Sequence, residues 1–381
     1  MYIIPFNIEN SEFILSRLKE KWGRPRRAYI PRQIEGYNEW HQTIDEICWL
    51  FKVCYTPKED VRKKRFRLDR IFHNYLTMHN ITLSKVAAIF LSNQNPNTRV
   101  ITDDLKRGWY NELSYSVPLK KSSLGLSFRD IELNKPITDM RFTFPSWQIT
   151  SAYYSVYFYL RSITLQKQDN FNLQEHGTTI SCFKNNVLNP LERVIWQFPL
   201  NISYAPGTRV ARRKLLINRI EHLNYRYSRH PRAPYASPSQ LFEEIYKVFR
   251  KRAKGRKKPT KYTIFDYLHD FRVWANYLDI DNLLNLWGSG YKGFIDQNLS
   301  LLMFFIGGIS EICYMSVFGP KQYLRNLQHL YDLFACNNPQ LQIDFVNSPP
   351  YQRLIIFKEM GLVGNTINLK PQYNINEVSL A

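Results

Sequence analysis

The sequence predicts a mainly α-helical protein: an enlarged helical bundle preceded by a basic N-terminal helical region. Apolar residues recur at helical spacing in several stretches, among them residues 150–162 and 241–249. Residues 299–319 form an apolar run long enough for a buried core helix. Strand signals are weak and confined to short runs such as "MRFTF" (140–144) and "RLIIF" (353–357), each bounded by turn-forming residues.

The length and composition allow a sizeable core. The chain has 381 residues, 44% of them hydrophobic, enough for two domains or one domain with insertions. We expect residues 1–100 to form the basic N-terminal region and residues 101–335 the bundle, with a basic insertion at 200–261. Residues 336–381 would be a C-terminal tail with a short strand or helix.

Net charge points to an anionic partner. The formal net charge is +20, and such an excess opposes compaction unless something anionic neutralises it. Nucleic acid is therefore the first partner to consider. An anionic membrane surface and a generically basic protein without a charged partner are the alternatives.

Other chemistries find little support in the sequence. The five cysteines are scattered without a C-x-x-C pair, which argues against a disulfide framework or a zinc site. Phosphate-binding glycine loops and the G-x-S-x-G motif are missing, so we expect neither a metal nor a cofactor. The start "MYIIPFNIENSEF" lacks signal-peptide features, and Glu311 with two glycines interrupts the apolar run 299–319. We expect a cytoplasmic protein with no membrane partner.

The N-terminal region contains two basic segments. Trp22–Arg32 mixes arginine, proline and aromatic residues and is typical of an extended arm, whereas Val61–Arg70 leads into a helix. Residues 81–90 have the small apolar texture of the first helix of a helix-turn-helix, and the following residues supply a turn and a second helix. A DNA-reading unit near 81–100 is thus one hypothesis.

The insertion contains the strongest basic bands. Arg209–Arg232 interleaves arginines with tyrosines and histidines, which suits single-stranded nucleic acid. Lys247–Lys261 holds nine basic residues and no acidic one, at the end of a helix packed through Leu241, Ile245, Val248 and Phe249. The alternative is a capped helix followed by a solvated loop. The predicted nucleic-acid contacts are Arg212, Arg213, Arg226, Arg229, Arg250, Lys251, Arg252, Lys254, Arg256, Lys257 and Lys258.

The segment "TSAYYSVYFYLRS" (150–162) is either a stacking platform for bases or a core helix. Helical spacing aligns Tyr153 with Tyr157 on one face and Tyr154 with Phe158 on the next, while Tyr159 falls elsewhere. Small residues between them let a partner helix approach. Because fully exposed rings would be costly, a helix buried on most sides is the favoured interpretation.

This helix and a later one resemble HEPN domains, the small prokaryotic four-helix units. After the tyrosine-rich helix come a polar turn, His176 and an apolar patch at Ile180–Phe183, as in the first half of these domains. "LHDFRVWANY" (268–277) resembles their second signature, an R-x-x-A-(D/N)-Y helix. Residues 103–119 and 299–318 would be the first and last helices. The resemblance covers about half of the chain in pieces, with an insertion of about 80 residues compared with short family members.

The resemblance implies a specific chemistry. Many HEPN domains are metal-independent ribonucleases whose signature is an arginine, four to six intervening residues and then a histidine, near the dimer interface. Histidine transfers the proton and arginine stabilises the charge on the phosphorane. Here Tyr277 stands where histidine is needed, and a phenol with a pKa near 10 is a poor base.

Two pairs remain as candidate catalytic residues. His269 precedes Arg272 by three positions on the same helical face and is the nearest substitute for the missing base. A buried histidine satisfied by a neighbour is the alternative for that position. Arg67 and His73 have the right spacing but lie outside the resembling helices.

We therefore expect a nucleic-acid-binding protein, RNA before DNA, in a prokaryotic defence or toxin-like setting that the resemblance implies. One alternative is an active metal-independent endoribonuclease. The other is a structural or interaction subunit of a nucleoprotein complex. A homodimer or a partner protein would fit the family, whose composite sites form across a dimer.

Overall fold

A computed structural model describes residues 35–57, 60, 66–91, 96–121, 145–168, 175–206, 238–256, 261–277, 292–335, 345 and 348–364. These residues are mainly helical, as predicted. The chain divides into two compact units, Met1–Glu39 and Trp40–Ala381. The division falls after residue 39 and not at residue 100, so residues 40–100 belong to the same unit as the predicted bundle. Helix α2 (Glu35–Tyr55) crosses this division.

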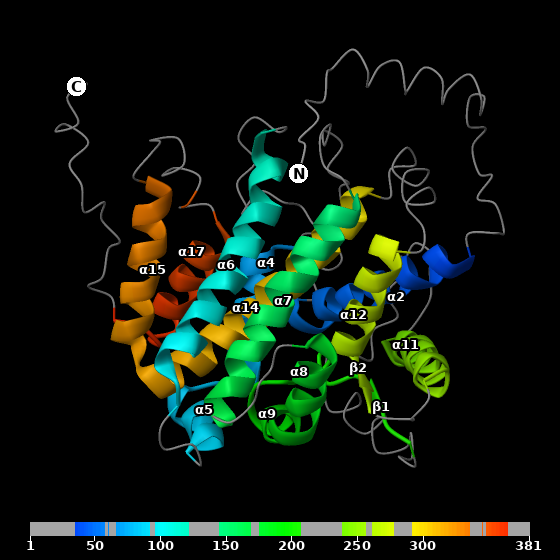
Figure 1. The fold of residues 1–381 in the computed structure, drawn as a ribbon, viewed down its shortest axis with the longest axis horizontal. Helices are drawn as coiled ribbons and strands as arrows, with labels where there is room; N and C mark the ends of the chain where they lie inside the picture. The colour runs from blue at the N-terminus through cyan, green and yellow to red at the C-terminus, as the bar shows by residue number, and fades with distance from the viewer. Residues whose placement is uncertain are drawn as a thin grey trace. The chain divides into compact units, whose positions relative to one another are not determined.

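Three long helices pack side by side at the centre of the second unit: α6 (Thr98–Lys121), α7 (Pro145–Lys167) and α14 (Lys292–Phe318) (Figure 1). Helices α6 and α7 approach closely through small side chains. Ser155 Oγ donates to the Gly108 carbonyl at 3.0 Å, and Ser162 Oγ donates to the Ile101 carbonyl at 3.3 Å. The small residues in α7 therefore do allow the close approach that the sequence predicts.

Helix α7 is buried on three sides. Tyr153 and Tyr157 are buried, which confirms a core helix. Tyr159, which falls outside the two aligned faces, is fully buried as well. Its ring fills the space left by Gly108 on α6 and Gly307 on α14, where an added Cβ at Gly307 would lie 2.9 Å from the ring. Helix α14 comes from far along the chain, so the periodicity of α7 alone could not reveal this third contact.

Helix α14 is the apolar run that the sequence singles out. Its segment Gln297–Phe318 is long and apolar enough to cross a membrane, but 83% of it is buried inside the protein, which confirms a core helix. It contacts α5, α6, α7, α15 and α17. The two glycines serve this packing, since a Cβ at Gly308 would collide with the ring of Phe72.

Four shorter helices surround α14: α4 (Leu68–Met78), α5 (Leu83–Phe90), α15 (Pro320–Ala335) and α17 (Pro349–Glu359) (Figure 1). The basic segment before α4 does not extend the helix through Arg67, which is the extended N-cap residue. The predicted strand 353–357 is wrong, because these residues lie within α17. Two prolines begin that helix, and its buried residues fall on several sides, so a short apolar run there looks like a strand. The other predicted strand, 140–144, lies outside the described residues.

A buried arginine attaches α17 to the core. Arg353 is fully buried and contacts Glu112 of α6 at 2.8 Å and Glu311 of α14 at 2.7 Å. Both carboxylates are buried as well. Glu311, whose charge argues against a membrane span, is thus paired with an arginine inside the protein.

The two helices of the predicted helix-turn-helix exist as α5 and α6. However, α6 packs lengthwise against α7, and its buried residues include Trp109, which hydrogen-bonds to Glu311 of α14. Much of the surface of α6 is therefore buried against other helices of the bundle. DNA reading by this unit stays a prediction that the packing disfavours.

The remaining elements flank α7 on its other side. A short helix α8 (His176–Cys182), a π-helical turn (Phe183–Val187) and α9 (Leu188–Val194) follow α7. Helix α11 (Pro238–Lys254) lies within the predicted insertion, and α12 (Ile264–Tyr277) follows it. Strands β1 (Ser203–Tyr204) and β2 (Tyr262–Thr263) pair antiparallel, with Ser203 opposite Thr263 and Tyr204 opposite Tyr262. In α11, Leu241, Ile245 and Phe249 are buried, as predicted.

Candidate functional site at the junction of helices α7, α8 and α12

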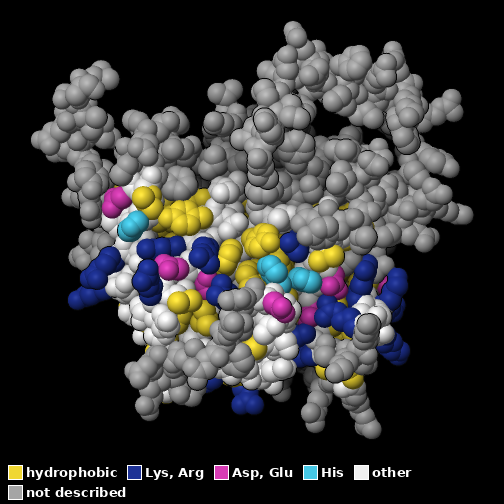
Figure 2. Space-filling view, viewed as in Figure 1, with side chains coloured by type: hydrophobic (Ala, Val, Ile, Leu, Met, Phe, Trp, Pro, Cys, Tyr) yellow, Lys and Arg dark blue, Asp and Glu magenta, His cyan; other side chains and the backbone are white. Residues whose placement is uncertain are grey.

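Three helices bring two histidines and an arginine together. His269 and Arg272 lie three residues apart on α12, and His176 begins α8. The rings of His176 and His269 are 6.1 Å apart between centroids. Both side chains are half-buried, and Figure 2 shows histidine side chains next to one another at the surface, beside hydrophobic and acidic ones. The predicted pair of α12 therefore meets a second histidine from another element.

Tyrosines of α7 hold this group in place. The hydroxyl of Tyr153 hydrogen-bonds with Nδ1 of His176 at 3.0 Å, and the ring of Tyr157 lies 4.2 Å from the ring of His176. Arg272 donates from Nη2 to the hydroxyl of Tyr154 at 3.1 Å. Its guanidinium also lies over the rings of Tyr153 and Tyr154, at 5.8 and 5.4 Å from their centroids.

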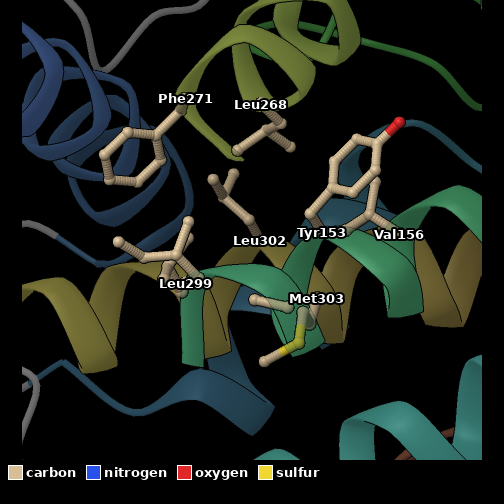
Figure 3. A pocket seen from close by; sticks show the side chains of 9 residues that line it. Tyr153, Val156, Leu268, Phe271, Leu299, Leu302 and Met303 are labelled. Carbon is tan, nitrogen blue, oxygen red and sulfur yellow. The ribbon is translucent and has the colours of Figure 1, made fainter. Parts of the chain in front are cut away.

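The floor of the site is apolar. A cavity of about 10 Å³ lies between α7, α12 and α14, below Tyr153 (Figure 3). Its lining residues share an apolar character: Ile149, Ala152, Val156, Leu268, Phe271, Leu299, Leu302 and Met303. An apolar cavity of this size stays dry, so this side of the site has little water to solvate a charge.

Burial changes the protonation of His176 and Tyr153. Desolvation, then the charge of Arg272 and the neighbouring His269, lower the pKa of His176 to about 4. Desolvation also raises the pKa of Tyr153. At neutral pH the phenol therefore keeps its proton and His176 is uncharged, so Nδ1 can accept from Tyr153 and Nε2 can face solvent as a donor.

Asp270 connects His269 to the basic end of α11. Its carboxylate lies 3.5 Å from Nδ1 of His269 and accepts from the hydroxyl of Tyr262 at 2.8 Å. It also accepts from Arg256 at 3.0 and 3.1 Å. Burial alone would raise the pKa of Asp270, but the hydrogen bond from His269 and the charge of Arg256 outweigh it, so the pKa lies below its usual value.

Arg256 is a structural residue and not an open phosphate contact. Besides Asp270 it pairs with the buried Asp266 at 2.7 Å, and its guanidinium lies 4.8 Å from the ring centroid of Tyr262. Lys184 pairs with the same Asp266 at 2.8 Å. That Arg256 binds nucleic acid stays a prediction, which its pairing with two carboxylates disfavours.

The other predicted contacts divide into three groups. Arg250, Lys251 and Lys254 are exposed near the C-terminal end of α11, and Arg252 is half-buried. Outside the described residues lie Arg212, Arg213, Arg226, Arg229, Lys257 and Lys258. We call the exposed residues Arg250, Lys251 and Lys254 the basic end of α11. Arg256 follows them in the chain and pairs with Asp270, which also contacts His269.

The second candidate pair does not form a site. Arg67 precedes α4 and pairs with Asp69 at 2.5 Å, whereas His73 lies in the second turn of that helix. Six helical residues correspond to a rotation of about 240°, so the two side chains leave α4 on different sides. Arg67 instead lines an open pocket of about 240 Å³ with Tyr55, Thr56, Pro57, Asp60 and Arg70.

Sequence reasoning missed His176 as a functional residue. It is part of the HEPN resemblance, but nothing in its spacing shows that it would meet His269, 93 positions later. Tyr277, which stands in place of the family's histidine, is the last residue of α12, and its side chain lies outside the described residues. Among the described residues, no three His, Cys, Asp or Glu side chains gather as a metal site would require.

Fold and site together define a mainly helical protein with a surface cluster of two histidines, an arginine and tyrosines, beside a basic helix end. No protein-family model, curated protein or solved structure matches the chain.

Proposed function

We propose that this protein binds nucleic acid, RNA in preference to DNA, through a surface that combines the basic end of α11 with the histidine cluster. One observation supports this most: Asp270 contacts both Arg256, just after α11, and His269. One carboxylate thereby links the histidine cluster to the segment that directly follows the exposed cations of α11. The HEPN resemblance adds a prokaryotic defence or toxin-like setting to the proposal.

Charge supplies the affinity. Arg250, Lys251 and Lys254 are exposed, and the chain as a whole has a net charge of +20. Each phosphate that such cations neutralise releases counterions, so affinity falls as salt rises, with a slope of about 0.7 per contact for a single strand.

The preference for RNA follows from the cluster. A neutral histidine beside a second histidine and an arginine can hydrogen-bond a 2′-hydroxyl and a phosphate oxygen together. DNA offers only the phosphate. The three side chains thus have more to recognise in RNA than in DNA.

Binding is tested by fluorescence anisotropy with labelled single-stranded RNA and the DNA of the same sequence. We expect the double variant Arg250→Glu, Lys254→Glu to weaken binding and flatten the salt slope. Lys321→Glu, at an exposed position on α15, is the matched control and should change little. If the intact protein binds neither strand at low salt, or if both charge variants behave alike, the proposal is wrong.

A second candidate function is RNA cleavage without a metal, which the contact between the two histidines and Arg272 favours. One histidine would take the proton of a 2′-hydroxyl, the oxygen would attack the adjacent phosphorus, and the 5′-oxygen would leave with a proton from the other histidine. Arg272 would stabilise the charge on the phosphorane. The products are a 2′,3′-cyclic phosphate and a 5′-hydroxyl.

A denaturing gel of RNA incubated with the protein in EDTA tests cleavage. His269→Ala and His176→Ala should each abolish it, Arg272→Gln should reduce it strongly, and His73→Ala should not matter. His329→Ala, an exposed histidine of α15, controls for general effects. Intact RNA with the unmodified protein, or cleavage that survives both cluster variants, rejects this second function and leaves binding alone.

A further inference from the structure

Rings and guanidinium groups alternate along one side of α7. Arg107 of α6 lies over the ring of Phe158, 5.6 Å from its centroid. The ring of Phe158 stacks on that of Tyr154 at 6.2 Å, with an angle of 29° between the planes. The guanidinium of Arg272 lies 5.4 Å from the centroid of Tyr154. The four side chains form a row, Arg107–Phe158–Tyr154–Arg272, here called the stacking row.

The two rings of the row differ from the other aromatic residues of α7. Tyr153, Tyr157 and Tyr159 are buried, whereas Tyr154 and Phe158 are only half-buried. Tyr154 and Phe158 are four residues apart, which places them one above the other on the same helical face. The segment that the sequence presents as either core or platform therefore serves as both.

Buried Asp104 fixes the Arg107 end of the row. Its carboxylate lies 3.7 Å from Nη1 of Arg107 and 3.4 Å from Nη1 of Arg161, and only 1% of its side chain is exposed. Arg107 itself is 56% exposed. One carboxylate thus pairs with two guanidinium groups, and the more exposed one, Arg107, lies over Phe158 and keeps donors available to a ligand.

We propose that the stacking row binds the unpaired bases of single-stranded RNA and directs the strand to the His176–His269 cluster. Bases stack on aromatic faces and guanidinium planes whatever their sequence, and arginine also binds the phosphates between them. The row ends at Arg272, whose neighbours include the cluster, so bases stacked here bring a phosphate near both histidines. Duplex RNA cannot use the row, because its bases are already stacked inside the helix.

This inference rests on the proposed function and adds its substrate class: a flexible single strand. An apolar protein partner fits the row less well, because cations flank the rings at both ends. A strand of nucleic acid matches both the rings and the cations.

Phe158→Leu tests the row with little loss of packing. We expect it to weaken binding of a single-stranded RNA 12-mer by at least about 5-fold while leaving the salt slope unchanged, since a stacked base contributes no phosphate contact. Phe158→Trp should keep or strengthen binding. Arg107→Ala should flatten the salt slope by about 0.7, the value of one contact to a single strand. Tyr351→Leu, at a half-buried tyrosine of α17, is the control and should bind as the intact protein does.

The outcomes separate this inference from the proposed function. If the intact protein binds RNA and Phe158→Leu binds equally well, the row is not used, although nucleic-acid binding stands. The same holds if Phe158→Leu weakens single-stranded and duplex RNA equally. If the intact protein does not bind RNA, the proposed function fails and the row with it. Thermal unfolding of each variant shows that the fold is retained.

Discussion

Arg353 should be one of the most sensitive positions for stability. Its Nε donates to both carboxylate oxygens of Glu311 at 3.0 Å, and its two terminal nitrogens donate to Glu112 at 2.8 Å each. Trp109 donates to Glu311 at 2.7 Å and Tyr159 donates to Glu112 at 2.6 Å. Two buried carboxylates therefore share one cation, and every partner is a protein group.

Replacing this arginine removes the cation that the two carboxylates share. Breaking a buried ion pair from one side costs about 3–5 kcal/mol, because the remaining charge stays in a poorly solvated place. Here two carboxylates are left, so Arg353→Met should lower the free energy of unfolding by at least that amount. A domain has a stability of about 5–15 kcal/mol, so the loss is a large part of the total.

Urea unfolding followed by circular dichroism measures this loss. Burial raises the pKa of Glu311 and Arg353 opposes this, so removing the arginine should raise the folded-state pKa of Glu311 further. The destabilisation should then be small below about pH 4 and grow as pH rises through the raised folded pKa, so it is larger at pH 8 than at pH 5. The triple variant with Glu112→Gln and Glu311→Gln should recover most of the loss, since glutamine oxygens still accept hydrogen bonds.

Arg325→Met, at an exposed arginine of α15, is the matched control and should change stability by about 0.5 kcal/mol or less. A loss for Arg353→Met below about 1 kcal/mol, or one that is the same at both pH values, would refute the role of the buried pairs.

Three further predictions concern single groups. Gly108→Ala should destabilise by about 1–3 kcal/mol in urea unfolding, because its Cβ would collide with a buried ring of α7; Gly177→Ala, whose Cβ meets nothing, should not, and equal effects would contradict the packing. Burial, offset in part by two arginines, raises the pKa of Asp104 to about 6. As pH rises from about 4 through 6, Asp104 must ionise inside the protein, and the free energy of unfolding should fall by up to about 3 kcal/mol. Asp104→Asn should not show this fall in a pH series of unfolding experiments. NMR titration of His176 should give a pKa of about 4, and Arg272→Gln should raise it by removing a nearby charge; an unchanged titration would show that the two groups are not close.

The sequence predicted what depends on local periodicity. The core position of α7, the burial of α14 and the packed face of α11 all follow from the spacing of apolar residues within one segment. The helix carrying Arg353 was taken for a strand, because five residues of a short buried helix contain no clear period. Its role as a partner of Glu311 was hidden for a different reason: an ion pair between distant segments leaves no trace in either segment alone.

In the candidate site, too, features set within one segment could be predicted and contacts between distant segments could not. The spacing of His269 and Arg272 on one helical face could be predicted, and the structure places them together. His176 joins them only because α8 folds back along α7, which no local pattern encodes. Arg256 shows the converse limit, since a charge run predicts a solvated or phosphate-binding face and cannot show that Asp266 and Asp270 pair with one of its members.

The most direct test of the RNA-binding surface is to cross-link single-stranded RNA containing a photoreactive uridine to the intact protein and identify the modified peptides by mass spectrometry. If the stacking row and the basic end of α11 form one surface, cross-links should concentrate in the peptides that contain Tyr154 and Phe158, with others near Arg250, and excess unlabelled RNA should remove them. Cross-links confined to α4 or α15, or none at a protein concentration that binds RNA, would contradict it.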